Sequence, residues 1–170
     1  MSTQSSIELD VHLRAYAPVS RPQETVLSTA RELNNAGLVD GLDVHDWPGT
    51  VRADRSTRVS RRYEEFRDWA AGEGVDIDQA FTRRTEHNQF TGETTEKIHT
   101  PIVCLAVYED DVLSAVLPCS TEDDEHITAT DYLRGLRQGM DLLGTLSWQD
   151  GDEDGESSEN GDEEIPVLTA

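Results

Sequence analysis

Lysine is nearly missing from this chain: Lys97 is the single lysine among 14 basic residues, and the other bases are arginines. Basic residues are few altogether, since 35 acidic residues bring the formal net charge to −21 over 170 residues. The acidity is not confined to the C-terminal end, because 26 acids still face 14 bases without the nine between Asp150 and Glu164. Charge far from zero suppresses association in concentrated salt. We therefore expect an acidic, halophilic protein.

Long hydrophobic runs are also lacking. The longest apolar segment, PIVCLAVY at residues 101–108, is far shorter than the roughly 20 residues that a membrane-spanning helix needs. The first residues, MSTQSS, have neither the charged start nor the apolar centre of a signal peptide. These absences predict a cytoplasmic protein that has no membrane association.

Motifs that carry chemistry are missing as well. The sequence has no glycine-rich phosphate loop, no nucleophile elbow and no closely spaced cysteine pair. Its two cysteines, Cys104 and Cys119, lie in apolar segments and are expected to be reduced core residues. Together with His99 and His126 they would make a zinc set whose spacing matches no common finger or ribbon. We therefore expect no enzyme, no metal site and no cofactor.

The first third of the chain predicts a strand, a helix and a second strand. Apolar and polar residues alternate along IELDVHLRAYA at residues 7–17, the period of a half-buried strand. SRPQ at residues 20–23 is typical of a capped helix start, and Gly37 is a suitable end. The next strand, VDGLDVHDWP, closes at Pro48 and Gly49. His12 and His45 fall on the polar side of these strands and are expected to be solvated.

The remainder predicts a second helix, a hairpin and a third helix. The second helix is predicted over residues 56–71, with Val59, Tyr63, Phe66 and Ala70 at helical spacing and a glycine at 72 or 74 as its end. Residues 80–88 are either a short strand or an extended loop, and residues 88–97 are turn-like. Two apolar runs within residues 98–120 predict a hairpin at the centre of the sheet. A capping box at Thr128 starts a helix that is expected to carry Leu133, Leu136, Met140 and Leu143.

This order of elements predicts an α+β fold, with a mixed, mainly antiparallel sheet and about three helices. A ferredoxin-like arrangement fits the order best, and a winged-helix arrangement is the alternative. We expect one domain over residues 6–148, a disordered N-terminus at residues 1–5 and a disordered acidic tail at residues 149–170, where Gly, Ser, Asp and Glu dominate.

One short basic segment stands out in this acidic chain. VRADRSTRVSRR at residues 51–62 holds five arginines and one acid, and it leads into the second predicted helix. Arginines beside free amides at a helix start form a typical phosphate site. The predicted nucleic-acid-binding residues are therefore Arg52, Arg55, Arg58, Arg61 and Arg62, extended by Arg83 and Arg84.

Two other interpretations of these arginines remain open. They could neutralise the protein's own carboxylates, for example through an Arg61 to Glu65 pair one helical turn apart. Alternatively, the acidic tail could contact the arginine patch and lower its affinity for nucleic acid until it is displaced.

Several segments resemble a family of small haloarchaeal proteins described as helix-turn-helix domain proteins. The resemblance runs from about Ile7 to Leu146 and is carried by a WP pair at residues 47–48 and by three longer segments: RRYEEFRDWA at 61–70, PIVCLAVYEDDVLSAVLPCS at 101–120 and TATDYLRGL at 128–136. The resemblance implies DNA binding and a role in transcription regulation. It supplies no individual binding residues.

The sequence as a whole favours a non-enzymatic, cytoplasmic regulator that binds DNA through its arginine-rich helix start, and we expect it to be a homodimer. The alternative is a ferredoxin-like protein-interaction or ligand-sensing module that binds no nucleic acid.

Overall fold

The computed structural model describes residues 5–15 and 18–146. In this part of the chain the elements follow one another as β1 (Ile7–Arg14), α1 (Arg21–Asn35), β2 (Gly41–Trp47), β3 (Thr50–Arg52), α2 (Arg58–Glu73), β4 (Thr82–His87), β5 (Thr94–His99), β6 (Val103–Glu109), β7 (Val112–Leu117), β8 (Cys119–Ser120), β9 (His126–Ile127) and α3 (Ala129–Arg137). The predicted α+β class, with three helices and a mixed, mainly antiparallel sheet, is confirmed.

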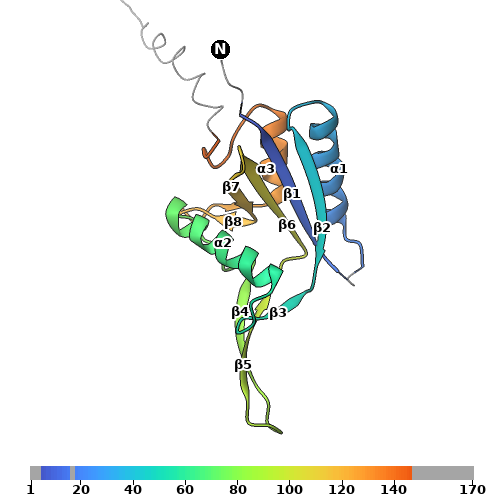
Figure 1. Cartoon of the computed structure of the whole chain (residues 1–170). Coiled ribbons are helices and arrows are strands. Elements are labelled where there is room, and N and C mark those ends of the chain that lie inside the picture. Colours follow the sequence, from blue (N-terminus) through green and yellow to red (C-terminus); the bar gives the residue numbers. More distant parts are fainter. Residues whose placement is uncertain (1–4, 16–17, 147–170) are drawn as a thin grey trace, which may run out of the picture.

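The main sheet has four strands in the order β2-β1-β6-β7 (Figure 1). β1 and β2 are parallel neighbours joined through α1, which is the expected strand–helix–strand unit. β1 pairs antiparallel with β6, and β6 pairs antiparallel with β7 through the expected hairpin. β6 is an inner strand as expected, but β7 is the outer strand of this sheet, so the prediction that both hairpin strands lie centrally is wrong for β7.

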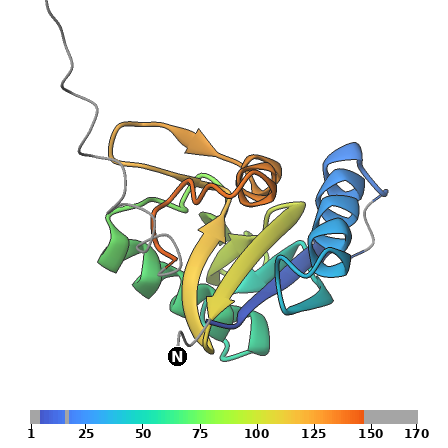
Figure 2. The ribbon, with the colours of Figure 1, turned by 90° about the horizontal axis from the view of Figure 1, so that it is seen from above.

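Helices cover both faces of the main sheet, with α1 and α3 on one side and α2 on the other (Figure 2). The alternation along β1 explains this layering, because Leu9 and Val11 are fully buried on the face that α1 covers. On the opposite face the ring of His12 contacts Phe66 of α2 at a centroid separation of 6.1 Å. We call this second side the α2 face.

Two smaller sheets complete the described fold. β3, β5 and β4 form a three-stranded sheet, and the β4–β5 hairpin projects away from the body of the molecule (Figure 1). β8 and β9 form a short pair before α3. The segment expected to be turn-like at residues 88–97 is a turn only in its first part, since β5 begins at Thr94 and is fixed there by pairing with β4. Its polar sequence reflects exposure of this hairpin rather than the absence of a strand.

All three helices begin with the capping box that the sequence predicts or permits. The pairs are Ser20 with Gln23, Thr57 with Ser60, and Thr128 with Asp131. α2 ends at Gly74, which has the left-handed φ of 69°, so the later of the two candidate glycines is the helix end.

The third helix is shorter than expected. α3 ends at Arg137, and Gly139 turns the chain with φ 77° while the amide of Met140 bonds back to the carbonyl of Gly135. Met140 is 50% exposed, so the prediction that it continues the buried face of the helix is wrong. The positive φ at Gly139 breaks the helical repeat before residue 140.

Several predictions concern residues that the structure does not describe. Residues 1–4 of the N-terminal segment and the whole tail at residues 149–170 lie outside the described part, so their predicted disorder stays a prediction, as does the single domain over 6–148. Within the described residues, no helix is both long enough and apolar enough to cross a membrane.

Candidate nucleic-acid interface

The start of α2 combines backbone amides that have no acceptor in the described chain with two exposed arginines. The amide of Thr57 donates to the hydroxyl of Ser60 over 2.8 Å, and the amide of Ser60 donates to the hydroxyl of Thr57 over 3.1 Å. The amides of Arg58 and Val59, the other two of the first turn, have no acceptor among the described residues. Two donors at the positive end of the helix dipole therefore remain available to an anion.

The arginine side chains of this helix start do not all point to solvent. Arg58, Arg61 and Arg62 line one hollow of about 250 Å³ together with Glu65. Arg62 is half-buried, donates to the phenol of Tyr108 over 2.7 Å and pairs with Glu65 at 3.3 Å. It is thereby fixed against the main sheet.

Arg58 and Arg61 remain exposed, and neither forms an ion pair with any described residue. The expected pair of Arg61 with Glu65 is wrong: Glu65 pairs with Arg62, three residues before it. Arg62 is the neighbour that also reaches Tyr108, which holds its guanidinium on the inner side of the helix. Arg61 instead approaches the carbonyl of Thr57 at 3.4 Å. Arg55, just before the helix, is exposed and makes no side-chain ion pair within the described part of the chain.

The remaining predicted arginines lie on the small three-stranded sheet. Arg52 makes a two-pronged contact with Asp54, with Nε to Oδ1 at 3.0 Å and Nη2 to Oδ2 at 2.8 Å. Arg83 pairs with Glu96 at 2.6 Å. Each of these two charges is matched by a neighbouring carboxylate.

Arg84 shares one row of this small sheet with two other bases. It is directly opposite Lys97 on β5, and Lys97 is directly opposite Arg52 on β3. Lys97 is neutralised by Glu86 at 2.7 Å, whereas Arg84 is exposed and has no ion pair in the described residues. The seven predicted residues thus form one group at the start of α2 and another on the small three-stranded sheet. Four of them offer an exposed side chain without an ion pair: Arg55, Arg58, Arg61 and Arg84.

The histidines and cysteines considered for zinc are dispersed. Cys104 and Cys119 are free thiols in the core, as expected. His99 lies against Thr50 and His126 against Ser120, each at 3.4 Å. Across residues 5–15 and 18–146, these four side chains form no cluster with metal-binding geometry.

One of the two strand histidines, His12, is not the solvated residue that the sequence suggested, whereas the side chain of His45 is 30% exposed. His12 is only 4% exposed, and its ring stacks on Trp47 at 4.6 Å and on His45 at 5.2 Å. Burial, helped by the positive charges of His45, Arg62 and Arg58, lowers the pKa of His12 to about 4. The prediction of a solvated His12 is wrong because α2 covers the polar side of β1.

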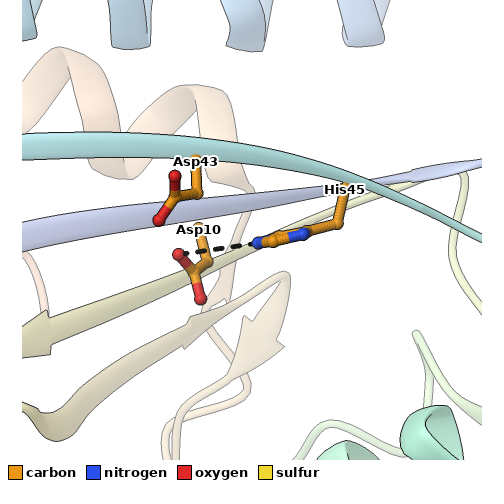
Figure 3. A group of neighbouring side chains, drawn as sticks. All are labelled: Asp10, Asp43 and His45. Atoms are coloured by element: carbon orange, nitrogen blue, oxygen red, sulfur yellow. Dashed lines mark ion pairs between the residues drawn. The ribbon is translucent and has the colours of Figure 1, made fainter.

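A group of possible metal ligands lies at the same place. In the described part of the chain, Asp10, Asp43 and His45 are the one set of three whose ligand atoms all lie within 4.8 Å of one another (Figure 3). Their side chains project from the same side of β1 and β2, and Nε2 of His45 is 4.0 Å from Oδ1 of Asp10. Burial raises the pKa of the Asp10 carboxyl, and His45 and Arg62 oppose this only in part.

A sequence signal for this group exists in a short repeat. LDVH occurs at residues 9–12 and again at residues 42–45. Parallel pairing of β1 with β2 aligns the two copies residue by residue, so Asp10 is opposite Asp43 and His12 is opposite His45. Sequence reasoning assigned both strands but did not compare them, and thus missed the cluster.

Comparison with known proteins gives one match. The sequence model of a family described as a helix-turn-helix domain matches residues 1–141. No curated protein and no solved structure matches the chain. In the described residues, strands separate each helix from the next, so two helices joined by a short turn do not occur there.

Proposed function

This chain belongs to that helix-turn-helix domain family, and we propose that it is a non-enzymatic, DNA-binding transcription regulator acting in a salt-rich cytoplasm. Family membership suggests DNA binding, and the place of contact that we propose is the start of α2. There, exposed Arg58 and Arg61 flank two amides that have no acceptor in the described chain. A phosphate group at this point would accept bonds from both kinds of donor.

The contact surface in this proposal is narrower than the seven arginines of the sequence. Arg58 and Arg61 are its centre, with Arg55 preceding them and Arg84 on the projecting hairpin. Arg52, Arg62 and Arg83 already have carboxylate partners, so their charges are matched within the protein. Phosphate contacts of this kind fix a protein on the duplex without reading its sequence.

High salt makes close contacts necessary. The Debye length is about 3 Å in molar salt, so attraction over longer distances is screened. Arginine suits these conditions because its planar guanidinium can donate two parallel hydrogen bonds to the oxygens of one phosphate group. We further propose a homodimer, and contact of the acidic tail with the arginine patch in the DNA-free protein.

DNA binding in molar potassium chloride tests the proposal. We expect the Arg58→Ala, Arg61→Ala double variant to lose about 1 kcal/mol or more of binding free energy per contact. The slope of the logarithm of its binding constant against the logarithm of the salt concentration should become less steep by about 2. The matched control is Arg21→Ala, Arg31→Ala, which removes the same charge from exposed positions of α1 on the other side of the main sheet. Equal effects of the two double variants, or no binding by the intact chain, would refute the proposed surface.

A second candidate, a ligand-sensing module, is favoured by one cavity. A space of about 480 Å³ lies between the end of α1 and the end of α3, and its lining includes Ile7, Val39 and Leu136. Small apolar ligands suit such a space. A thermal-shift screen that finds an apolar ligand, with no DNA binding by the intact chain, would favour this candidate over the first.

A further inference from the structure

The aligned LDVH copies place two carboxylates face to face on neighbouring strands. Asp10 on β1 and Asp43 on β2 occupy directly opposite positions of a parallel pair. Like charges directly opposite one another destabilise a sheet. The pair lies on the α2 face, where His45 and Arg62 bring positive charge close to Asp10 while Asp43 and Glu65 bring negative charge. A cation between the two facing carboxylates would relieve the repulsion between them.

Asp10 has the environment of a ligand rather than of an ordinary surface acid. Its residue is 9% exposed, and no described residue donates a hydrogen bond to its carboxylate. The nearest basic atom, Nε2 of His45, is 4.0 Å away, which is too far for a hydrogen bond. A carboxylate that is largely withdrawn from water, here with 12% of its side chain exposed, and that has no donor among the described residues is costly. A cation bound between the two side chains would remove that cost.

The geometry accommodates one ion. Three nitrogen or oxygen ligands that each lie about 2.0–2.2 Å from one metal ion are at most about 3.5–3.8 Å from each other when they are equally spaced. The ligand atoms of Asp10, Asp43 and His45 lie within 4.8 Å of one another, so inward side-chain shifts of up to about 0.6–0.8 Å bring all three to one ion. Figure 3 shows the three side chains converging on one side of the two strands.

The three ligands and their support define the class of ion. We propose that Asp10, Asp43 and His45 bind one divalent first-row transition-metal ion, because an imidazole with two carboxylates suits zinc, iron or manganese better than magnesium or calcium. His12 stacks on the ring of His45 at 5.2 Å and holds it in place. Asp43 is exposed and the side chain of His45 is 30% exposed, so the ion enters from solvent and keeps a position open to water.

Zinc titration of the full chain tests the site. Isothermal titration calorimetry with zinc chloride in molar potassium chloride suppresses weak binding to the many surface acids. We expect one equivalent to bind to the intact chain, and Asp43→Asn and His45→Gln to bind at least tenfold more weakly. Asp46→Asn is the matched control, because Asp46 lies on the same strand, is exposed and pairs with Leu13, which places it on the opposite face.

The outcomes separate a specific site from general acidity. The proposal is supported if Asp46→Asn binds zinc as tightly as the parent and if Asp43→Asn and His45→Gln bind it at least tenfold more weakly. The proposal is overturned if the intact chain does not bind zinc at about 1 mM, a concentration near the dissociation constant of the weakest metal sites that proteins use. It is also overturned if all variants bind zinc equally well. Circular dichroism in EDTA confirms that each variant is folded before titration.

Asp10→Asn gives a second readout that a purely structural role would not produce. Without metal, this variant is expected to melt at a higher temperature than the parent, because a buried charge without a donor is removed. It should also lose the rise in melting temperature that zinc gives the parent. A lower melting temperature in EDTA together with an unchanged response to zinc would overturn the role of Asp10. The experiment uses no DNA, so the metal site stands or falls independently of the proposed function.

Discussion

Arg62 donates a hydrogen bond to the phenolic oxygen of Tyr108 over 2.7 Å, and the same phenol lies 3.3 Å from Glu65. This contact joins the first turns of α2 to β6, an inner strand of the main sheet. It also explains why one arginine of the basic segment is unavailable to a ligand while its neighbours are exposed.

Tyr108→Phe should therefore destabilise the fold. Removing the hydroxyl takes away the 2.7 Å hydrogen bond of Arg62 but keeps its ion pair with Glu65 and its contact with the aromatic ring, 5.8 Å from the ring centroid. We expect a loss of about 1–2 kcal/mol in the free energy of unfolding, measured by chemical denaturation, since hydrogen bonds to charged groups contribute about that much. In a double-mutant cycle, Arg62→Met should cost less in the Tyr108→Phe background than in the parent. Additive effects would show that the two side chains do not interact.

The two glycines at the end of α2 should respond to alanine with opposite signs. Gly74 has φ 69°, and an added Cβ would lie 2.6 Å from a carboxylate oxygen of Glu122. Gly72 is helical and would place its Cβ in open space. Gly74→Ala should lower the free energy of unfolding by about 1 kcal/mol, whereas Gly72→Ala should raise it by about 0.5–1 kcal/mol. Denaturant midpoints of the two variants test this, and a shift of both in one direction would contradict it.

Acid should weaken the fold through His12. In the unfolded chain His12 has a pKa of about 6.5, so it becomes protonated as the pH falls below that value. In the folded chain its pKa is about 4, so it stays neutral until the pH approaches 4. The unfolded state then binds more protons, so the free energy of unfolding falls between pH 6.5 and 4, by on the order of 2–3 kcal/mol. The raised pKa of Asp10 opposes part of this loss.

His12→Phe provides the control for this pH effect. A phenyl ring keeps the stack between His45 and Trp47 and removes the titrating group. Denaturation in EDTA across the same pH range should show a flatter dependence for the variant than for the parent. Identical slopes would mean that other groups govern the acid response.

The two thiols should be inert in the native protein. Burial raises the pKa of Cys119 to about 11 and that of Cys104 further still. Because the thiolate is the reactive form, Ellman's reagent at pH 8 should react slowly with the folded chain. In denaturant the same reagent should react with both cysteines. Rapid labelling of the folded chain would show that the surrounding core opens easily.

Local patterns predicted most of the helices and strands, because capping boxes and alternating polarity act over a few residues. The starts of α1 and α3 and the β6–β7 hairpin are examples. Strand order, by contrast, depends on partners far along the chain. The outer position of β7 and the burial of His12 under α2 follow from such pairings, and the alternation in either segment by itself carries no information about them.

The residues of the candidate interface were likewise predictable from the sequence only in part. The basic segment was visible in the sequence, and so was the helix start beside it. Which arginines are matched by carboxylates was not, because Glu96 meets Arg83 across a strand pair and Tyr108 meets Arg62 across two layers. The opposed Asp10 and Asp43 become apparent only when β1 and β2 are compared in register.

The LDVH repeat also has a consequence for mutational tolerance. Its two copies have the same residues and the same strand conformation, but β1 is an inner strand and β2 is an outer one. Val11 is fully buried, whereas its counterpart Val44 is 44% exposed. Replacement of the valine therefore meets tight packing in the first copy and open water in the second, so Val44 tolerates changes that Val11 does not.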